Sequence, residues 1–381
     1  MSKVGWQTKT LDQIAVNLDS KRVPITKADR ISGEYPYYGA SGIVDYVADF
    51  IFDEETLLVS EDGANLLARS TPIAFPATGQ YWVNNHAHIL KFENKITQRL
   101  VELYLESIPL DDYITGAAQP KLNQKALNSI PIPVPQLPEQ HRIVAILDAA
   151  FDHIATARAN CEANLLNARA IFESHLQAVF MQRGDGWEDK TLEQIATIFG
   201  RGKSRHRPRN AAHLYGGKYP FIQTGDIRNS EHFITEYSQT YSEAGLAQSK
   251  LWPKGTICIT IAANIAETGI LDFDACFPDS VIGIVPNPKD AITGFVEYLL
   301  QSFKVRLQSL GQGSAQANIN MGTFENEKFP FPSVGEQKQI VAKLDALSAE
   351  TRRLESLYQR KRQALDDLKK SLLHQAFSGA L

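Results

Sequence analysis

Cysteines are few in this 381-residue sequence, and long apolar runs are missing. The three cysteines, Cys161, Cys258 and Cys276, are odd in number, widely spaced and without a Cys-x-x-Cys pair. They predict neither a disulfide framework nor a zinc site and are typical of a reducing compartment. No stretch approaches the ~18 apolar residues that a membrane-spanning helix requires, and the first residues lack the apolar centre of a secretion signal. These absences predict a cytoplasmic protein without membrane contact.

Sequence motifs for catalysis are missing as well. There is no Gly-x-x-x-x-Gly-Lys-Ser/Thr loop for ATP, and no Asn/Asp-Pro-Pro-Tyr segment of an amino-methyltransferase. Residues 311–316 depart from the dinucleotide-binding pattern at its last glycine. A nuclease site built from Asp279, Glu336 and Lys338 would take its last two residues from the predicted start of a long helix. We therefore expect this chain to perform no catalysis and to bind no cofactor or metal.

The composition is that of an ordinary globular protein, with 43% apolar residues, 22% charged residues and a net charge of −4. The length predicts two or three domains at roughly 150 residues each. The negative net charge does not exclude nucleic-acid binding, because such binding depends on local positive charge.

The chain repeats itself. Residues 5–15 recur as residues 186–196, and residues 139–149 recur as residues 336–346, each pair with eight of eleven positions identical. A period of this length is too long for a solenoid unit. It indicates a tandem duplication of a whole domain together with an appendage.

Each half is predicted to end in a long helix, residues 136–183 and 333–381. The first helix follows a proline-rich run and contains no proline or glycine between Pro138 and Gly184, a pattern that marks a helix start. Apolar residues recur every seven positions in both helices, which indicates a coiled coil. They are Leu147, Ile154, Cys161 and Ala168 in the first helix, and Leu344, Thr351, Tyr358, Leu365 and Leu372 in the second, with Leu368 three positions after its partner.

A helix of this length would be ~65 Å long and would extend beyond any single small domain. We expect the two helices to pair antiparallel, with the globular domains at opposite ends and approximate two-fold symmetry. The alternative is that each helix packs only on its own globular half. Arg158 and Lys361 fall on seam positions, where they set the register or face a third chain.

The globular halves, residues 1–135 and 184–332, are predicted to be mixed α/β. Strand patterns cover residues 57–60, 73–75 and 256–261, and short helices cover residues 98–106 and 295–310. Between their matching ends the two interiors diverge, which suggests two modules that perform one kind of task on two targets. The predicted fold class is α/β (mixed α+β), with two globular domains and an antiparallel pair of long helices in a tandem duplication.

Five cations lie within nine residues of the second half, without an acidic residue among them: Arg201, Lys203, Arg205, Arg207 and Arg209. Glycines and a proline flank them, so the segment is predicted to be a loop. Arginines in such a loop favour DNA phosphates and guanine edges as partners. The alternative is a charged loop that contacts only solvent.

The remaining candidates for DNA contact are mostly amides and hydroxyls in predicted loops, because amides pair with adenine edges; each can also be an ordinary loop residue. They are Tyr38, Ser41, Asn65, Asn84, Asn85, His86, Gln119 and Lys121 in the first half, and Gln223, Thr224, Asp226, Gln316 and Asn318 in the second. Tyr38 also fits a core position. His86 and His88 would need a third ligand to hold a metal, so we favour hydrogen bonding at a strand end for this pair.

Several of these features occur twice and in the same order. Those found in both halves are the starts at Trp6 and Trp187 with Leu11 and Leu192, Gln119 with Asn123 and Gln316 with Asn320, and a Pro-x-Pro run followed by Glu-Gln-x-x-Ile-Val. Residues 37–42, 61–64 and 85–88 of the first half and residues 219–227 of the second complete the set. Together they resemble the specificity subunits of type I restriction–modification systems over essentially the whole chain.

The resemblance implies a non-catalytic subunit with two target recognition domains, residues 1–135 and 184–332. Each would recognise one half of a bipartite double-stranded DNA site, and the long helices would fix the spacer between the halves. It also implies two modification subunits that bind S-adenosylmethionine and restriction subunits that use ATP and Mg. The candidate subunit contacts are the repeated helix starts: Glu139, Gln140, Ile143, Glu336, Gln337 and Ile340.

Three other functions stay open. The first is a coiled-coil scaffold that binds only proteins, in which residues 201–209 would have no function. The second is the specificity subunit of a system that methylates DNA without cleaving it. The third is the nuclease at Asp279.

Overall fold

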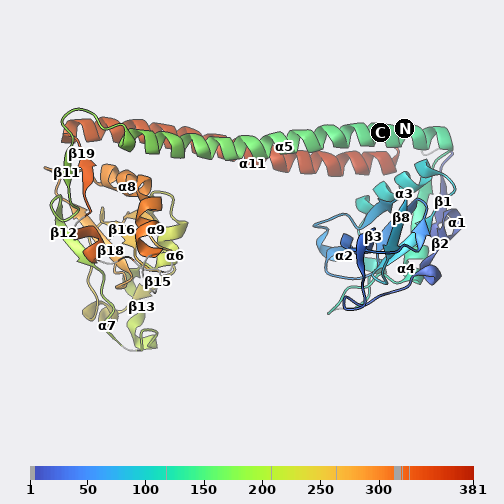
Figure 1. The fold of residues 1–381 in the computed structure, drawn as a ribbon, viewed down its shortest axis with the longest axis horizontal. Coiled ribbons are helices and arrows are strands. Elements are labelled where there is room, and N and C mark those ends of the chain that lie inside the picture. The colour runs from blue at the N-terminus through green and yellow to red at the C-terminus, as the bar shows by residue number, and fades with distance from the viewer. Residues whose placement is uncertain are drawn as a thin grey trace. The chain divides into compact units, whose positions relative to one another are not determined.

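The computed structural model describes residues 5–116, 118–206, 208–262, 264–312, 319, 321–325 and 327–381 (Figure 1). The chain divides into two compact units. Unit 1 comprises Met1–Glu162 with Gln359–Leu381, and unit 2 comprises Ala163–Tyr358. Both divisions fall inside the long helices. Within the described residues, no helix is both long and apolar enough to cross a bilayer.

The two long helices are α5 (Leu137–Met181) and α11 (Val334–Ser378), each of 45 residues. In α5 the residues predicted to recur every seven positions are all buried: Leu147, Ile154, Cys161 and Ala168. In α11 the same holds for Leu344 and Thr351. Leu368 is an exception, because 47% of it is exposed, and its predicted place in the seam is wrong.

Ion pairs between α5 and α11 show that the helices run antiparallel. In unit 1, Arg158 lies 2.6 Å from Asp366 and Glu162 lies 3.5 Å from Arg362. In unit 2, Arg169 lies 2.9 Å from Glu355. Residue numbers rise along α5 as those of its partners fall along α11. The alternative in which each helix packs only on its own half is therefore wrong, and Arg158 pairs with the opposite helix.

Unit 1 contains two four-stranded sheets and two apolar clusters. One cluster contains residues of both sheets, and the other packs the first sheet against residues 95–107. Their strand orders are β2-β9-β6-β7 and β4-β3-β8-β5. The strands are β2 (Val16–Asn17), β3 (Ser32–Gly39), β4 (Gly42–Val47), β5 (Phe52–Asp53), β6 (Thr56–Ser60), β7 (Ala74–Ala77), β8 (Gln80–Val83) and β9 (Ala87–Lys91). The helices are α1 (Leu11–Ile14), η1 (Asp19–Lys21), α2 (Asn65–Ala68), α3 (Lys95–Ser107), η2 (Asp111–Tyr113) and α4 (Gln124–Asn128). Strand β6 is fully buried, as its continuous apolar run predicts.

Unit 2 is built on a five-stranded sheet of order β12-β18-β16-β17-β14, beside a ribbon of β13 and β15. The strands are β12 (Ala196–Arg201), β13 (Tyr215–Phe221), β14 (Phe233–Ile234), β15 (Gln239–Tyr241), β16 (Ile257–Thr260), β17 (Thr268–Leu271) and β18 (Val281–Pro286). The helices are η3 (Ala212–Leu214), α6 (Thr224–Asn229), α7 (Glu243–Ala247), α8 (Thr293–Ser302), α9 (Lys304–Gln312) and α10 (Met321–Glu325). The helix predicted over 295–310 is thus two helices, and the mixed α/β prediction is confirmed.

The duplicated sequence forms a duplicated frame. In unit 1, β1 (Gln7–Thr10) pairs antiparallel with β10 (Pro131–Val134), the last strand before α5. In unit 2, β11 (Glu188–Lys190) pairs antiparallel with β19 (Phe329–Phe331), the last strand before α11. Leu11 and Leu192, at equivalent positions after β1 and β11, are both buried. Each globular domain is thus closed by its own two ends just before its long helix begins.

A buried glutamine fixes the first turn of each long helix. Gln140 Nε2 donates to the Pro135 carbonyl oxygen at 2.8 Å, and its Oε1 accepts from the Thr97 hydroxyl at 2.8 Å. Gln337 Nε2 donates to the carbonyl oxygens of Pro332 and Asp290, both at 3.0 Å. These contacts join the helix start to the polypeptide just before it and to the globular domain.

An equivalent aspartate then joins each long helix to the short helix of its domain. Asp148 Oδ1 accepts from Arg99 of α3 at 2.7 Å, and Asp345 Oδ1 accepts from the Tyr298 hydroxyl of α8 at 2.8 Å. In unit 1, α3, the start of α5 and the end of α11 share one apolar cluster. In unit 2, α8, the start of α11 and the end of α5 do the same. The duplication is thus visible in the packing of each unit.

Replacing Gln337 by Ala should lower the free energy of unfolding of unit 2 by about 2–4 kcal/mol, because it leaves buried backbone groups without partners. These are the carbonyls of Asp290 and Pro332 and the amide of Ile292, which donates to Gln337 Oε1 at 3.0 Å. Urea unfolding measures the change. Gln339→Ala, on the exposed side of the same turn, should change stability by less than about 0.5 kcal/mol. Equal effects of the two variants would contradict the role assigned to Gln337.

Burial raises the pKa of Glu102 on α3 to about 7, although Arg99 opposes the rise and Asp148 adds to it. The folded protein therefore holds this proton more tightly than the unfolded chain does. Its contribution to stability should fall by on the order of 2 kcal/mol between pH 5 and pH 8 and level off above pH 7. Glu102→Gln should remove this fall in chemical unfolding experiments, whereas Glu93→Gln, at an exposed site, should keep it. A Glu102→Gln protein with the unaltered pH dependence would show that another group titrates.

Candidate nucleic-acid interface

Four loops of unit 1 meet at one place. The Ser60 hydroxyl donates to the Ala40 carbonyl oxygen at the turn between β3 and β4, and the Asn84 amide donates to the Tyr38 carbonyl oxygen at 3.0 Å. The Glu61 amide donates to the His86 carbonyl oxygen at 2.9 Å, and the Gly63 amide donates to the Pro120 carbonyl oxygen at 3.0 Å. We call the polar side chains at this junction the unit-1 loop surface: Ser41, Asp62, Asn85, His86, Gln119 and Lys121.

Five of the predicted contact residues of the first half are exposed members of this surface: Ser41, Asn85, His86, Gln119 and Lys121. They come from separate parts of the sequence, and the backbone hydrogen bonds between the loops bring them together. Their role in DNA contact stays a prediction.

The other three predicted residues of this half have internal contacts. Tyr38 packs against Phe75 and Tyr81 at ring-centroid distances of 6.1 and 5.7 Å, and burial raises its pKa. Asn84 is buried, and its Oδ1 accepts from the His86 amide at 2.8 Å. Asn65 Nδ2 donates to the Thr71 carbonyl oxygen at 2.9 Å. Tyr38 is half-buried against an apolar cluster, so its contact with DNA stays a prediction, and Asn84 and Asn65 shape their loops.

Asp62 was missed as a candidate, because Asp62-Gly63 in sequence indicates only a turn. Its carboxylate lies 2.9 Å from His86 Nδ1, and the His86 side chain is 47% exposed. An aspartate at a DNA-binding surface accepts from the cytosine amino group, and a histidine nitrogen donates to a base edge. No pattern in the sequence indicates that the two loops meet.

Metal binding at the histidine pair does not fit the structure. His86 and His88 do not share a site: His86 bonds to Asp62, whereas His88 is buried against Asp19. Asp19, Glu61 and His88 do place one ligand atom each within 4.8 Å of one another. However, His88 Nδ1 faces Asp19 Oδ2 at 2.6 Å and Nε2 faces the Leu122 carbonyl oxygen at 2.7 Å. A metal requires a free ring nitrogen, so hydrogen bonding at a strand end is the interpretation that the contacts support.

The basic segment of unit 2 begins at the end of β12 and continues as extended chain. The Gly202 amide donates to the Val281 carbonyl oxygen at 2.8 Å, and the Lys203 amide donates to the Phe277 carbonyl oxygen at 3.1 Å. A Cβ at Gly202 would lie 2.3 Å from the Phe277 carbonyl oxygen, so only glycine fits there. Gly202 and Ser204 are buried, whereas Arg201, Lys203 and Arg205 are exposed. The loop prediction is thus confirmed beyond Arg201, which is the last residue of β12.

Two of the arginines are held by one aspartate. Arg209 donates to both carboxylate oxygens of Asp279 at 2.8 Å, and Arg201 Nε donates to the Asp279 carbonyl oxygen at 2.7 Å. Asp279 is therefore engaged with arginines, and Glu336 accepts from Trp187 Nε1 at 2.9 Å. Within the described residues, Asp279 and Glu336 do not belong to a metal-binding group. Arg207 lies outside the described residues.

Lys250 joins the basic segment from a distant part of the sequence. The Ser249 hydroxyl donates to the Lys203 carbonyl oxygen at 2.8 Å, and the His206 amide donates to Gln248 Oε1 at 3.0 Å. Lys250 Nζ lies 3.5 Å from the ring centroid of Trp252. Burial, and after it the charge of Lys203, lower the pKa of Lys250. Sequence reasoning missed this residue because only the tertiary contacts bring it to Lys203.

The polar residues at 223–226 cap a helix. Asp226 Oδ2 accepts from the Gln223 amide at 2.8 Å at the start of α6, and Gln223 Nε2 donates to Gln239 Oε1 at 2.7 Å. Thr224 is partly exposed. Gln316 and Asn318 lie outside the described residues, so their predicted contacts stay untested.

The predicted subunit contacts divide by burial. Gln140, Ile143 and Gln337 are buried in their own units, and Ile340 packs on the core of unit 2. Glu139 lies 2.8 Å from Arg142, and Glu336 binds Trp187. A buried side chain cannot contact a partner in this arrangement. The buried residues of the repeated Glu-Gln-x-x-Ile pattern are therefore explained by docking of each helix on its own domain, and Glu139, Glu336 and the partly buried Ile340 stay as predictions.

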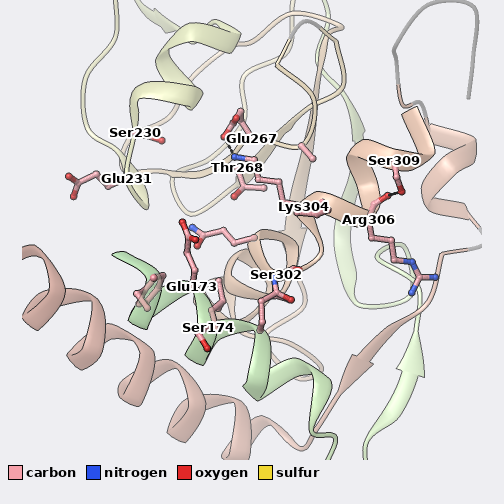
Figure 2. Close-up of a pocket in the computed structure, with 17 residues that line it drawn as sticks. Glu173, Ser174, Ser230, Glu231, Glu267, Thr268, Ser302, Lys304, Arg306 and Ser309 are labelled. Carbon is pink, nitrogen blue, oxygen red and sulfur yellow. Dashed lines mark hydrogen bonds and ion pairs between the residues drawn. The ribbon is translucent and has the colours of Figure 1, made fainter. Parts of the chain in front are cut away.

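An open pocket of about 1030 Å³ lies in unit 2 between the end of α5 and helices α8 and α9 (Figure 2). Figure 2 shows Glu173 on α5, with Glu231, Glu267 and Lys304 around the opening. Lys304 Nζ lies 2.8 Å from Glu267 Oε2, which neutralises that cation. The lining carries Glu173, Glu231 and Glu267 beside Lys304 and Arg306, so it has no excess of positive charge to favour a phosphate.

The sequence matches the family model of the type I restriction–modification DNA specificity domain twice, over residues 3–163 and 184–362. The chain belongs to this family. The two matched regions correspond to the two copies of the duplicated frame, because each begins near a Gly-Trp pair and runs into a long helix.

Specificity subunits are also among the individual proteins that the chain resembles. A putative type I restriction enzyme specificity subunit from Haemophilus influenzae is 28% identical over 354 residues, which cover 90% of this chain and 87% of the relative. The MjaVIII specificity subunit from Methanocaldococcus jannaschii is 22% identical over 99% of this chain and 93% of its own length.

Solved structures share the fold. A chain from a study of assembly and conformational transition in the type I restriction–modification system aligns with a TM-score of 0.78 at 17% identity, covering 99% of this chain and 98% of that one. The HsdS subunit from Thermoanaerobacter tengcongensis aligns with a TM-score of 0.59 at 17% identity, covering 99% of this chain and 97% of its own.

Proposed function

We propose that this chain is the non-catalytic subunit that selects the DNA target of a type I restriction–modification enzyme. Each unit recognises one half of a bipartite double-stranded site. The observation that carries the proposal is the duplicated family match, since each matched region contains a complete globular core closed by its own strand pair.

The surfaces of the two units supply the chemistry for this role in different ways. The unit-1 loop surface offers amide, hydroxyl and imidazole groups of the kind that pair with base edges. The basic segment of unit 2 offers cations for phosphates. Lys203 and Lys250 have no acidic residue within ion-pair distance among the described residues, so a phosphate would relieve the repulsion between them.

The partners follow from the proposed role. Two modification subunits, which would carry S-adenosylmethionine, dock on the helical regions, and restriction subunits would bring ATP and Mg. The same chain would serve a system that only methylates, since target selection is common to both. The complex would act in the cytoplasm, where it can bind chromosomal and incoming DNA.

A scaffold that binds only proteins is the second candidate. The contacts of Arg201 and Arg209 with Asp279 favour it to a limited extent, because they give two of the five cations an internal role. Lys203 and Arg205 remain exposed on the same side of an extended segment, which the scaffold function does not explain.

Exchanging residues 187–330 for the matching region of another specificity subunit should change one half of the methylated motif and leave the other half unaltered. The reason is that unit 2 has its own core and its own candidate contact surface. Modified-base sequencing of cells that express the chain with its modification subunits measures the motif. A change in both halves, or in neither, would contradict the modular proposal.

Lys203→Met combined with Lys250→Met should weaken DNA binding by the assembled complex and lower the slope of log affinity against log salt by about 1–2, at roughly 0.9 per lost phosphate contact. Methionine keeps the apolar stem over Trp252. Lys254→Met is the matched control, because Lys254 is exposed and already lies 2.7 Å from Asp272. An unaltered salt slope in the double variant would remove both lysines from the interface.

A further inference from the structure

A group of buried charges lies directly beneath the unit-1 loop surface. His88 on β9 is 1% exposed. Its Nδ1 lies 2.6 Å from Asp19 Oδ2, and its Nε2 lies 2.7 Å from the Leu122 carbonyl oxygen. Both oxygens are acceptors, so each ring nitrogen faces a hydrogen-bond acceptor. Asp19 also accepts from the Ile89 amide at 2.9 Å.

A second carboxylate completes the group. Glu61 Oε2 accepts from Arg22 at 2.5 Å, and Glu61 Oε1 lies 3.1 Å from Lys121 Nζ. Arg22 also donates to the Ala87 carbonyl oxygen at 2.9 Å. His88 Nδ1 lies 3.8 Å from Glu61 Oε2, so both carboxylates lie beside the same ring nitrogen.

Both carboxylates are stabilised by neighbouring groups despite their burial. Burial acts to raise the pKa of Asp19, but the hydrogen bond and charge of His88 outweigh it and hold that pKa below its usual range. At Glu61 burial is likewise outweighed, by Arg22, His88 and Lys121, so its pKa is also lowered. We call these five side chains the His88 network: Asp19, Arg22, Glu61, His88 and Lys121.

The His88 network connects the loops that form the surface above it. Glu61 precedes Asp62, and Ala87, whose carbonyl binds Arg22, follows His86. Leu122, whose carbonyl binds His88, follows Lys121, a member of both groups. A change in the geometry of the network therefore displaces Asp62, His86 and Lys121 relative to one another.

Stability alone is a weak explanation for such a network. Buried ion pairs are often replaced by apolar side chains of similar volume without loss of stability, because desolvation offsets much of the attraction between the charges. Hydrogen-bonded charges fix the direction and distance between the groups they join, whereas apolar side chains do not. The loops of the surface require that property if they are to match base edges.

Unit 2 contains a buried histidine–carboxylate pair without this connection. His232 Nδ1 lies 2.7 Å from Glu297 Oε2, and its ring stacks on Tyr298 at 4.7 Å. Glu297 lies on α8, which packs on α11 through the Tyr298–Asp345 contact. This pair touches neither the basic segment nor the loops around it in the described contacts, and it serves as a matched control.

We propose that His88 is a positioning residue for base recognition by unit 1, holding the loops of Asp62, His86 and Lys121 in the register at which they contact a half-site. The inference rests on the proposed function, since it assigns the fidelity of one half-site to a residue that does not touch DNA.

The test compares base discrimination in the complete complex with its modification subunits. His88→Gln removes the ring and its contacts with Asp19 and Leu122, and Asp19→Asn is a milder change that keeps the shape and the acceptor for Ile89. Binding is measured for the cognate site and for a panel in which each base pair of each half-site is changed in turn. Domain exchange identifies the half-site of unit 1. His232→Gln controls for general loss of stability.

We expect both variants to reduce discrimination in the half-site of unit 1 by about fivefold or more at one or more positions, the smaller end of what a mismatch costs. Discrimination in the other half-site should stay as in the parent complex, and His232→Gln should reduce neither. Where His88→Gln fails to fold, Asp19→Asn carries the test.

Two results would overturn the inference. The first is a weaker affinity that is equal for cognate and mismatched sites, and the second is a loss that His232→Gln reproduces in the same half-site. Failure of the proposed function itself is distinguishable, because the parent complex would then show no half-site that changes when unit 1 is exchanged.

Discussion

The buried glutamine at the start of each long helix is the contact on which the rest of the structure depends. Gln140 and Gln337 each bind the carbonyl oxygen of the proline five residues earlier and a group of their own globular domain. A 45-residue helix amplifies any error at its first turn, so a hydrogen-bonded anchor there fixes the direction in which the helix leaves its domain. The same constraint explains why this part of the sequence is duplicated so closely while the domain interiors differ.

The frame and the surface of each unit obey different physical requirements. The frame must reproduce one geometry twice, and it does so with equivalent strand pairs, equivalent glutamines and equivalent aspartates facing the short helices α3 and α8. The surfaces carry different chemistry: hydrogen-bonding loops over a buried charge network in unit 1, and an extended basic segment with Lys250 beside it in unit 2. Two distinct surfaces on one repeated frame are what a subunit requires if it is to recognise two unlike DNA sequences.

Much of this architecture could be predicted because its signals are local. The seven-residue spacing of Leu147, Ile154, Cys161 and Ala168 fixed a buried stripe, and the prolines before Gln140 and Gln337 marked both helix starts. The candidate site was predicted less well. Polar residue type alone does not separate the exposed Asn85 from the buried Asn84, or Lys203 from the aspartate-bound Arg209. Gln140 and Gln337 were taken for partner contacts because a repeated polar residue near a helix start looks exposed in sequence.

The sequence by itself determined the duplication, the two long helices and the family, because each is encoded in the order and spacing of residues along the chain. Tertiary structure alone decided which side chains work together. Asp62 meets His86, His88 meets Asp19, and Ser249, next to Lys250, meets Lys203, each pair from separate parts of the sequence. The physical reason is that hydrogen bonds and ion pairs act over a few ångströms in space, and only the packing of β-strands and loops brings those groups within that range.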